Sequence, residues 1–161
     1  MPIAATESWA LFFHLAGAFL FVGGSIVAAV AFEAARRRRE PAEIALLLGL
    51  TRAGVLLVAA GTLIVLPFGL WLVHLDGYGY GDGWITAAFA LFVVVSVLGA
   101  AGGQRPKRAR KLAERLAASG DAETPELRAL LDDSTALALN YASAAIVVAI
   151  IMLMVFRPGS G

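Results

Sequence analysis

Four long apolar stretches dominate this sequence and limit what it can fold into. They cover residues 9–32, 53–74, 84–103 and 136–156. Each has about 20 residues or more, so a helix rising about 1.5 Å per residue would cross a hydrocarbon core of about 30 Å. The chain is 60% hydrophobic and 16% charged, whereas a soluble domain is about half apolar and a quarter charged. The sequence therefore predicts an all-α integral membrane protein, a four-helix antiparallel bundle forming one polytopic domain over residues 1–161.

The basic residues predict which way the chain crosses the membrane. Of the 13 Lys and Arg residues, all but Arg157 lie in the first and third connections or directly beside them. Loops rich in Lys and Arg stay in the cytoplasm, and Trp gathers at the membrane interfaces. The second connection, residues 75–83, has no basic residue. We therefore expect both termini outside, with Trp9, Trp71 and Trp84 at the outer interface.

Helix signals outside the apolar stretches predict the remaining boundaries. Thr6 is a candidate N-cap for the first helix, and Pro41 suits the first position of the second. A helix following the third span is predicted to stop at Gly120, and Thr124 with Pro125 predicts a restart that runs into the fourth span. The second, third and fourth helices should thus extend into the cytoplasm, with a helical hairpin at about residues 104–134.

His14 is the main candidate for a functional residue. It is the only ionisable side chain within residues 9–32, and such residues inside a span are costly and usually functional. It shares a helical face with a stripe of mostly small residues, which lets helices approach closely: Ala10, Gly17, Phe21, Gly24 and Ala28. It should therefore face the bundle, about 7–8 Å below the outer interface. Two interpretations stay open: an axial ligand to haem or a metal ligand, or a hydrogen bond to a carbonyl of another helix beside Pro67.

His74 is the only other histidine, and it is the candidate second ligand. It ends the second span, one to two helical turns from the depth of His14, so an interfacial role is the alternative. Asp76 and Asp82 lie in a Gly- and Tyr-rich loop typical of an ordinary turn. The alternative is that both carboxylates meet a cation from outside, although two carboxylates are few for a metal site.

Other polar groups near the cytoplasmic ends of the spans predict structural contacts. Glu33 and Arg52 would form an ion pair between the first two helices, and Asn140 with Ser143 would hydrogen-bond across the bundle or line a small polar cavity.

Several short motifs resemble an uncharacterised four-helix bacterial membrane family, domain of unknown function 2269. They are the segment Gly69–Leu72 (GLWL), the Trp84 that opens the third span, and Met154–Gly159 (MVFRPG). The first span, with an early His and a later Gly pair, is also distantly similar to the copper-resistance D-type and protoporphyrinogen-oxidase families. The resemblance to the haem-containing relatives implies that His14 ligates haem. Those oxidases carry a basic residue within a later span that this chain lacks, so the resemblance does not extend to their activity.

Our leading hypothesis is a small membrane protein of the bacterial inner membrane that binds b-type haem or a metal through His14, with His74 as a weaker second ligand. The alternatives are a non-catalytic scaffold or subunit with a structural histidine, and an oligomeric small-molecule transporter. The sequence has no P-loop, Rossmann or HExxH motif, which favours a protein that is not an enzyme. The expected partners are other copies of the chain and anionic lipid headgroups, not nucleic acid. The residues expected to contact headgroups are Arg36, Arg37, Arg38, Arg39, Lys107 and Arg108.

Overall fold

The chain folds into helices alone over the part that the structure describes. The structure is a computed structural model that describes residues 2–158, with only the backbone described for residues 2–5. Within residues 2–158 the helices are α1 (Pro2–Arg36), α2 (Pro41–Leu75), α3 (Gly83–Gly102), α4 (Gln104–Ser119), α5 (Pro125–Leu131) and α6 (Ser134–Phe156). Four segments are long and apolar enough to cross a membrane: Thr6–Arg36, Pro41–Leu75, Gly83–Ser119 and Pro125–Phe156. The predicted all-α membrane fold with four spans is confirmed.

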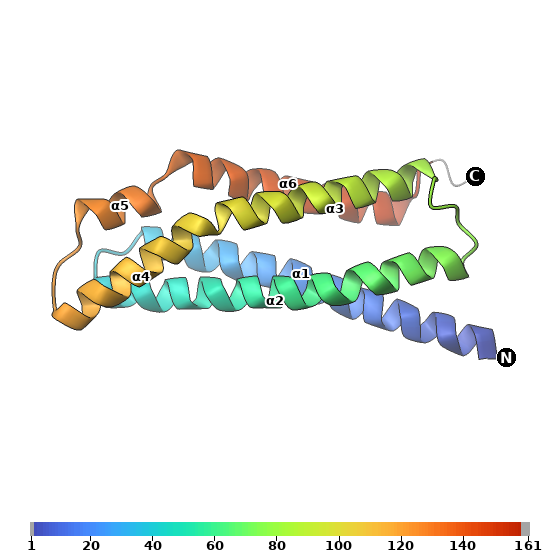
Figure 1. Cartoon of the computed structure of the whole chain (residues 1–161), viewed down its shortest axis with the longest axis horizontal. Helices are drawn as coiled ribbons and strands as arrows, with labels where there is room; N and C mark the ends of the chain where they lie inside the picture. Colours follow the sequence, from blue (N-terminus) through green and yellow to red (C-terminus); the bar gives the residue numbers. More distant parts are fainter. Residues whose placement is uncertain (1, 159–161) are drawn as a thin grey trace.

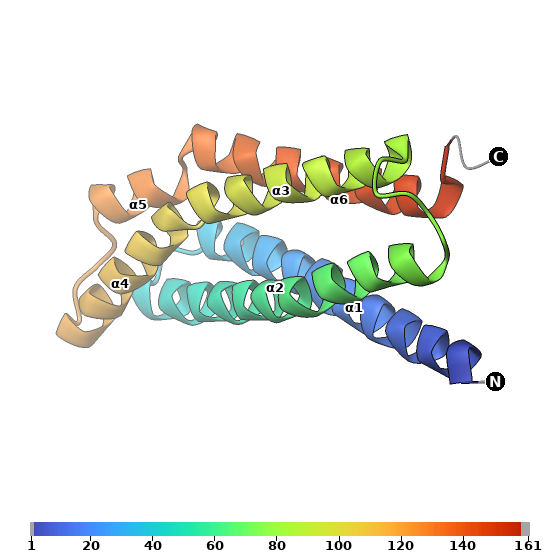
Figure 2. The same ribbon diagram turned by 45° about the vertical axis from the view of Figure 1, so that its right-hand side comes forward.

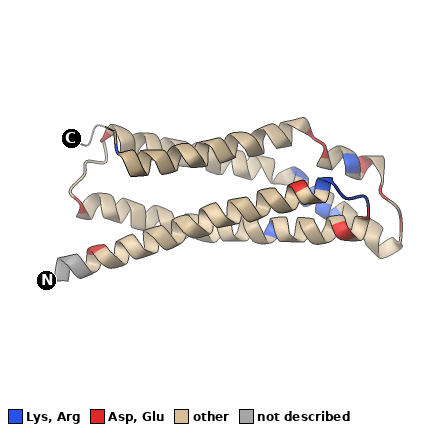
Figure 3. Ribbon diagram, turned by 180° about the vertical axis from the view of Figure 1, so that it is seen from behind, with Lys and Arg blue, Asp and Glu red and all other residues tan. Residues whose placement is uncertain are grey.

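The four spanning helices pack as two antiparallel pairs (Figures 1 and 2). α1 packs along α2, and α3 packs along α6. The start of α1, the end of α6 and the α2–α3 loop lie at one end of the bundle, which we call the terminal end (Figure 1). The α1–α2 turn, α4 and α5 lie at the opposite end. Blue Lys and Arg ribbons gather there (Figure 3), so we call it the basic end.

α1 and α2 approach so closely that glycine is required between them. A Cβ atom on Gly24 would lie 2.7 Å from the Gly54 carbonyl oxygen, and one on Gly61 would lie 2.5 Å from the Phe21 nitrogen. Buried small residues recur every seven positions along α1, at Ala10, Gly17, Gly24 and Ala31. A repeat of seven keeps one face of a helix on its partner, and small side chains let the backbones touch. The predicted small-residue face of the first helix is therefore confirmed as the α1–α2 contact.

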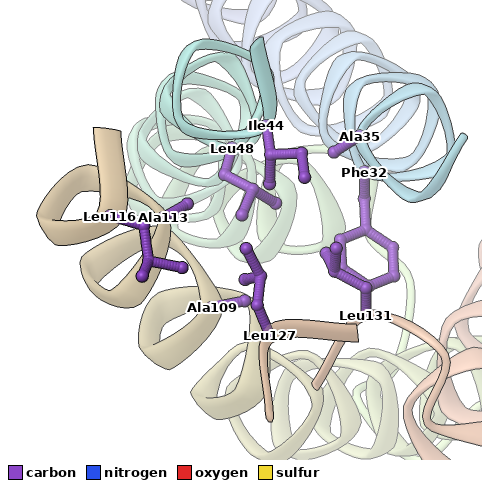
Figure 4. Close-up of a cluster of buried hydrophobic side chains, with 9 residues drawn as sticks. All are labelled: Phe32, Ala35, Ile44, Leu48, Ala109, Ala113, Leu116, Leu127 and Leu131. Carbon is purple, nitrogen blue, oxygen red and sulfur yellow. The ribbon is translucent and has the colours of Figure 1, made fainter. Parts of the chain in front are cut away.

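A cluster of buried apolar side chains lies at the basic end, with Phe32 at the end of the first predicted span and the other members outside the predicted spans. Side chains from α1, α2, α4 and α5 meet there (Figure 4). Its members are Phe32, Ala35, Ile44, Leu48, Ala109, Ala113, Leu116, Leu127 and Leu131. Along the spans many large apolar side chains face outwards, as Phe19 does with 81% of its surface exposed, although Phe21 and Val95 are buried between helices. A lipid bilayer is apolar, so only the part of the chain outside it gains from burying apolar surface in protein.

Two predicted helix boundaries are wrong. α1 begins at Pro2, so Thr6 lies inside the helix and is not its N-cap. The helix that begins at Pro125 ends at Leu131, and α6 starts separately at Ser134. Asp133 causes the second start, because its side chain accepts a hydrogen bond from the Ala136 backbone N–H at 2.7 Å.

The other predicted boundaries are confirmed. Pro41 occupies the first turn of α2, and Gly120 ends α4 in the left-handed conformation at φ 73°. Thr124 caps α5 by accepting a hydrogen bond from the Leu127 N–H at 3.3 Å. α3 and α4, with Gly103 between them, carry the chain from the bundle to the basic end.

Candidate functional site

His14 sits at the α1–α2 contact and is half-buried. Its Nδ1 atom lies 3.0 Å from the carbonyl oxygen of Val65, two residues before Pro67. A carbonyl oxygen only accepts, so Nδ1 carries the hydrogen and donates. In the neutral ring Nε2 is then left with its lone pair. A histidine that ligates a metal or haem iron is fixed in the same way, by a second-shell hydrogen bond from its other nitrogen.

Gly69 forms one wall of this site. A Cβ atom at position 69 would lie 2.9 Å from both Cε1 and Nδ1 of the His14 ring. The edge of the ring with Nδ1 and Cε1 therefore lies close to the α2 backbone, between the Val65 carbonyl and a residue without a side chain. Gly69 is also the first residue of the GLWL motif, so the motif begins at the wall of the histidine site.

A row of aromatic rings lies on the same two helices, and it includes the residues directly before His14 and Gly69 in the sequence, Phe13 and Phe68. Phe13 stacks on Phe68 with 4.8 Å between ring centroids. Trp9 stacks on Phe13 at 6.1 Å, and Phe68 lies 5.9 Å from Trp71. Trp9 and Trp71 are exposed, as the prediction of an interfacial aromatic belt requires. Through these ring contacts Trp9 and Trp71 are linked to Phe13 and Phe68, the sequence neighbours of His14 and Gly69.

His74 does not share a site with His14. His74 is exposed in the last turn of α2, five residues beyond the glycine that the His14 ring touches. No group of three or more His, Cys, Asp or Glu side chains that could hold a metal ion occurs among the described residues. Asp82 is used locally, since it accepts a hydrogen bond from the Gly79 N–H at 3.2 Å in the loop.

The predicted ion pair between Glu33 and Arg52 is wrong. Glu33 instead pairs with Arg36 at 2.8 Å and Arg37 at 3.1 Å, one turn along its own helix. Neighbours three and four positions apart on a helix are always within reach, whereas Arg52 is exposed on α2. The Asn140 and Ser143 side chains also do not bridge helices within the described residues: Ser143 donates to the Leu139 carbonyl of its own helix at 2.8 Å.

Asn140 lines a hollow in the surface, but this is not the small polar cavity predicted for Asn140 and Ser143, since its wall is mostly apolar and does not include Ser143. The hollow is a groove of about 270 Å³ between α1 and α6 near the basic end. Apolar side chains form most of its wall, and Glu33 and Tyr141 add polar groups beside Asn140.

Arg128 connects three segments of the chain at the basic end, a role that the sequence did not predict. It lies on α5, and its guanidinium donates to the carbonyl oxygens of Arg36 and Arg38, each at 2.6 Å, and to the Glu123 carboxylate. The last carbonyls of a helix have no partner within that helix. Arg128 satisfies carbonyls at and just beyond the end of α1, and so fastens α5 to the α1–α2 turn. The partners lie some 90 positions apart in sequence, which hides the contact from any local pattern.

The family-like motifs of the third span and the C-terminal segment meet at the terminal end. Arg157 donates to the Tyr78 hydroxyl at 2.9 Å. Its guanidinium carbon lies 5.6 Å from the Tyr78 ring centroid and 5.7 Å from that of Trp84. The Tyr78 and Trp84 rings themselves pack edge to face at 5.4 Å. Cation–π contacts of this kind are attractive. Arg157 therefore connects the end of α6 to Tyr78 in the α2–α3 loop and to Trp84 at the start of α3.

The helix lengths, the apolar outer faces and the charge distribution define the class of the protein: an integral membrane protein with four spans. The chain belongs to the family described as "Predicted integral membrane protein (DUF2269)", whose model matches residues 9–158. No curated protein and no solved structure matches the chain.

Proposed function

We propose that this protein is a haem-binding protein of the bacterial inner membrane, with Nε2 of His14 as the axial ligand to a b-type haem. The observation that carries the proposal is the hydrogen bond from Nδ1 to the Val65 carbonyl at 3.0 Å. It fixes the tautomer that leaves Nε2 free to bind iron. The ring is only half-buried, which leaves part of it accessible to a ligand.

Haem suits these residues better than a bare metal ion. A protein-bound metal ion needs several side chains from the protein, and the described residues bring no three candidate ligands together. Haem supplies its four equatorial nitrogens itself, so one histidine can hold it. Bound haem would supply electron-transfer or ligand-binding chemistry at its iron. The chain would contribute Nε2 of His14 as the ligand, the orientation of its ring through Val65 and the space left by the missing side chain at Gly69.

The test is a haemin titration of the purified protein in detergent. We expect a one-to-one Soret band and quenching of Trp9 and Trp71 fluorescence, because ring contacts link both tryptophans to the sequence neighbours of His14 and Gly69. His14→Ala should abolish both signals, and His74→Ala, the matched control, should weaken them far less. Gly69→Ala should lower the affinity while leaving the fold intact, since the added methyl displaces a ring at the end of a flexible side chain. Absence of a protein-specific Soret band, or an unchanged band in His14→Ala, would refute the proposal.

The second candidate is a membrane scaffold in which His14 is purely structural. The same hydrogen bond supports it, because polar side chains that bond across helices hold membrane bundles together. A double-mutant measurement of such bonds in membranes gives about 0.6 kcal/mol on average. The scaffold predicts that His14→Ala lowers the thermal stability slightly and that haemin addition does not raise the stability of the unmodified protein.

A further inference from the structure

The basic residues at the basic end fall into two sets that the sequence does not distinguish. The arginines of the run 36–39 all have carboxylate partners. Arg36 pairs with Glu33 and Asp132. Arg37 also pairs with Glu33. Arg38 pairs with Glu43 at 3.6 Å, and Arg39 pairs with Glu123 at 3.3 Å. The densest positive run in the chain is therefore largely neutralised by its own protein.

The second set lies on the outer face of α4. Lys107, Arg108, Lys111 and Arg115 are exposed, and none of the ion pairs within residues 2–158 involves them. At about 100° per residue they occupy an arc of about 100° on the helix. Ala109, Ala113 and Leu116 point the other way, into the core at the basic end. α4 is thus fixed to the protein by one face and presents uncompensated positive charge on the other.

This basic face begins where the third span ends. Lys107 follows Gly103 by four residues, so it lies about 6 Å along the helix from the end of the apolar stretch, and Lys111 lies about 12 Å along it. The headgroup layer on each side of a bilayer is about 5–8 Å thick, and a Lys or Arg side chain can reach back towards it. Arg115, a further turn away, lies beyond it.

From this placement, we propose that Lys107, Arg108 and Lys111 of α4 form a binding site for anionic phospholipid headgroups, and that Arg37, Arg38 and Arg39 do not. Phosphate oxygens of a headgroup complement unpaired Lys and Arg side chains, and each basic residue near an anionic surface strengthens binding about fivefold. The site holds the start of α4, and with it the core at the basic end, against the membrane surface. It is independent of whether haem binds at His14.

Native mass spectrometry of the protein in detergent tests this, with phosphatidylglycerol as the anionic probe and phosphatidylcholine, which is zwitterionic with no net charge, as the reference. The variant K107Q/R108Q/K111Q and the control R37Q/R38Q/R39Q remove the same number of charges at comparable distance from a span. We expect the unmodified chain to prefer phosphatidylglycerol. Three fivefold effects would combine to about a hundredfold, and we expect the α4 variant to bind phosphatidylglycerol at least tenfold more weakly, whereas the control changes by less than about threefold.

Phosphatidylcholine binding and the helical circular dichroism spectrum check that each variant is folded. A second measurement needs no variant: raising the salt concentration from about 0.05 to about 0.5 M should abolish the preference of the unmodified protein for phosphatidylglycerol, since exposed charges are screened. Equal losses in the two variants, or no preference for phosphatidylglycerol over phosphatidylcholine in the unmodified chain, would overturn the proposal.

Discussion

At the scale of single residues, neighbours in the sequence have opposite roles because of which face of a helix they occupy. Gly23 and Gly24 are adjacent in α1. A Cβ atom on Gly23 would meet nothing within 4 Å, whereas one on Gly24 would lie 2.7–2.8 Å from Gly54, Leu57 and Val58 of α2. The close contact is with backbone atoms, which cannot move aside without separating the helices.

Gly24→Ala should therefore destabilise the protein by about 1–3 kcal/mol, the usual cost of overpacking. Gly23→Ala, the matched control, should be neutral or slightly stabilising, because Ala favours a helix over Gly. The two variants are compared by thermal unfolding in detergent, followed by the far-ultraviolet circular dichroism of the helices. Equal melting temperatures would show that α1 and α2 do not touch at this glycine.

The histidine site could be predicted from sequence only in part. The position of His14 among small residues predicted that it faces another helix and offered a carbonyl beside Pro67 as a partner. The structure has this bond, to the Val65 carbonyl, and the bond uses Nδ1 and not Nε2. The contact with Gly69 was not predicted, because it depends on the register of α1 against α2. That register follows from glycines on both helices together, and a pattern read along one helix does not give it.

At the scale of helices, the break between α5 and α6 depends on Asp133. Its side chain caps α6 at the Ala136 N–H and also pairs with Arg105. Asp133→Ala should lower stability by about 1–2 kcal/mol through loss of the cap. Asp133→Asn keeps an acceptor oxygen and should retain most of the stability.

Asp82→Ala is the comparison for the capping effect, since Asp82 occupies the N-cap of α3 without a side-chain capping bond. Asp82→Ala removes the loop bond from the Gly79 N–H and no capping bond. Thermal melts of the three variants decide the matter. If Asp133→Asn were as unstable as Asp133→Ala, the ion pair with Arg105 and not the cap would be the main contribution.

The link between α5 and the α1–α2 turn gives a second prediction for the helices. Lys in place of Arg128 keeps the charge but cannot donate to the Arg36 and Arg38 carbonyls and the Glu123 carboxylate at once. Arg128→Lys should therefore loosen α5, and limited proteolysis should cut the segments around residues 37–40 and 120–124 faster. The α3–α6 pair should stay intact, as melting in detergent can confirm. Unchanged cleavage rates would mean that the apolar contacts of Leu127 and Leu131 hold α5 without Arg128.

At the scale of the whole molecule, composition and charge predicted the membrane fold better than the contacts inside it. Span lengths follow from bilayer thickness, a constraint that acts on each segment alone. The arrangement of the spanning helices as two pairs depends on contacts between helices far apart in sequence. The buried cluster at the basic end likewise depends on side chains from four helices. The arginine run shows the same limit: its sequence suggested free positive charge, whereas its partners lie as far away as Glu123 and Asp132.

We predict that the basic end of the whole molecule faces the cytoplasm and the terminal end faces outwards. Both basic connections lie at one end of the bundle and the basic-free loop at the other (Figure 3), so a single rule places both ends at once. The chain contains no cysteine, and single cysteines can be introduced without background. In intact cells a membrane-impermeant maleimide should label Gly81→Cys in the α2–α3 loop and should label Ala122→Cys, between α4 and α5, only after the cells are opened.

Ser96→Cys serves as the control within the membrane: it lies on the third span, where lipid should block the reagent until the protein is denatured. Labelling of Ala122→Cys but not Gly81→Cys in intact cells would reverse the orientation, and labelling of both would mean that the chain inserts in two directions. Either result would also place the basic face of α4 against the other leaflet, where anionic lipid is not concentrated. The accessibility of two positions at opposite ends thus determines which membrane surface α4 meets.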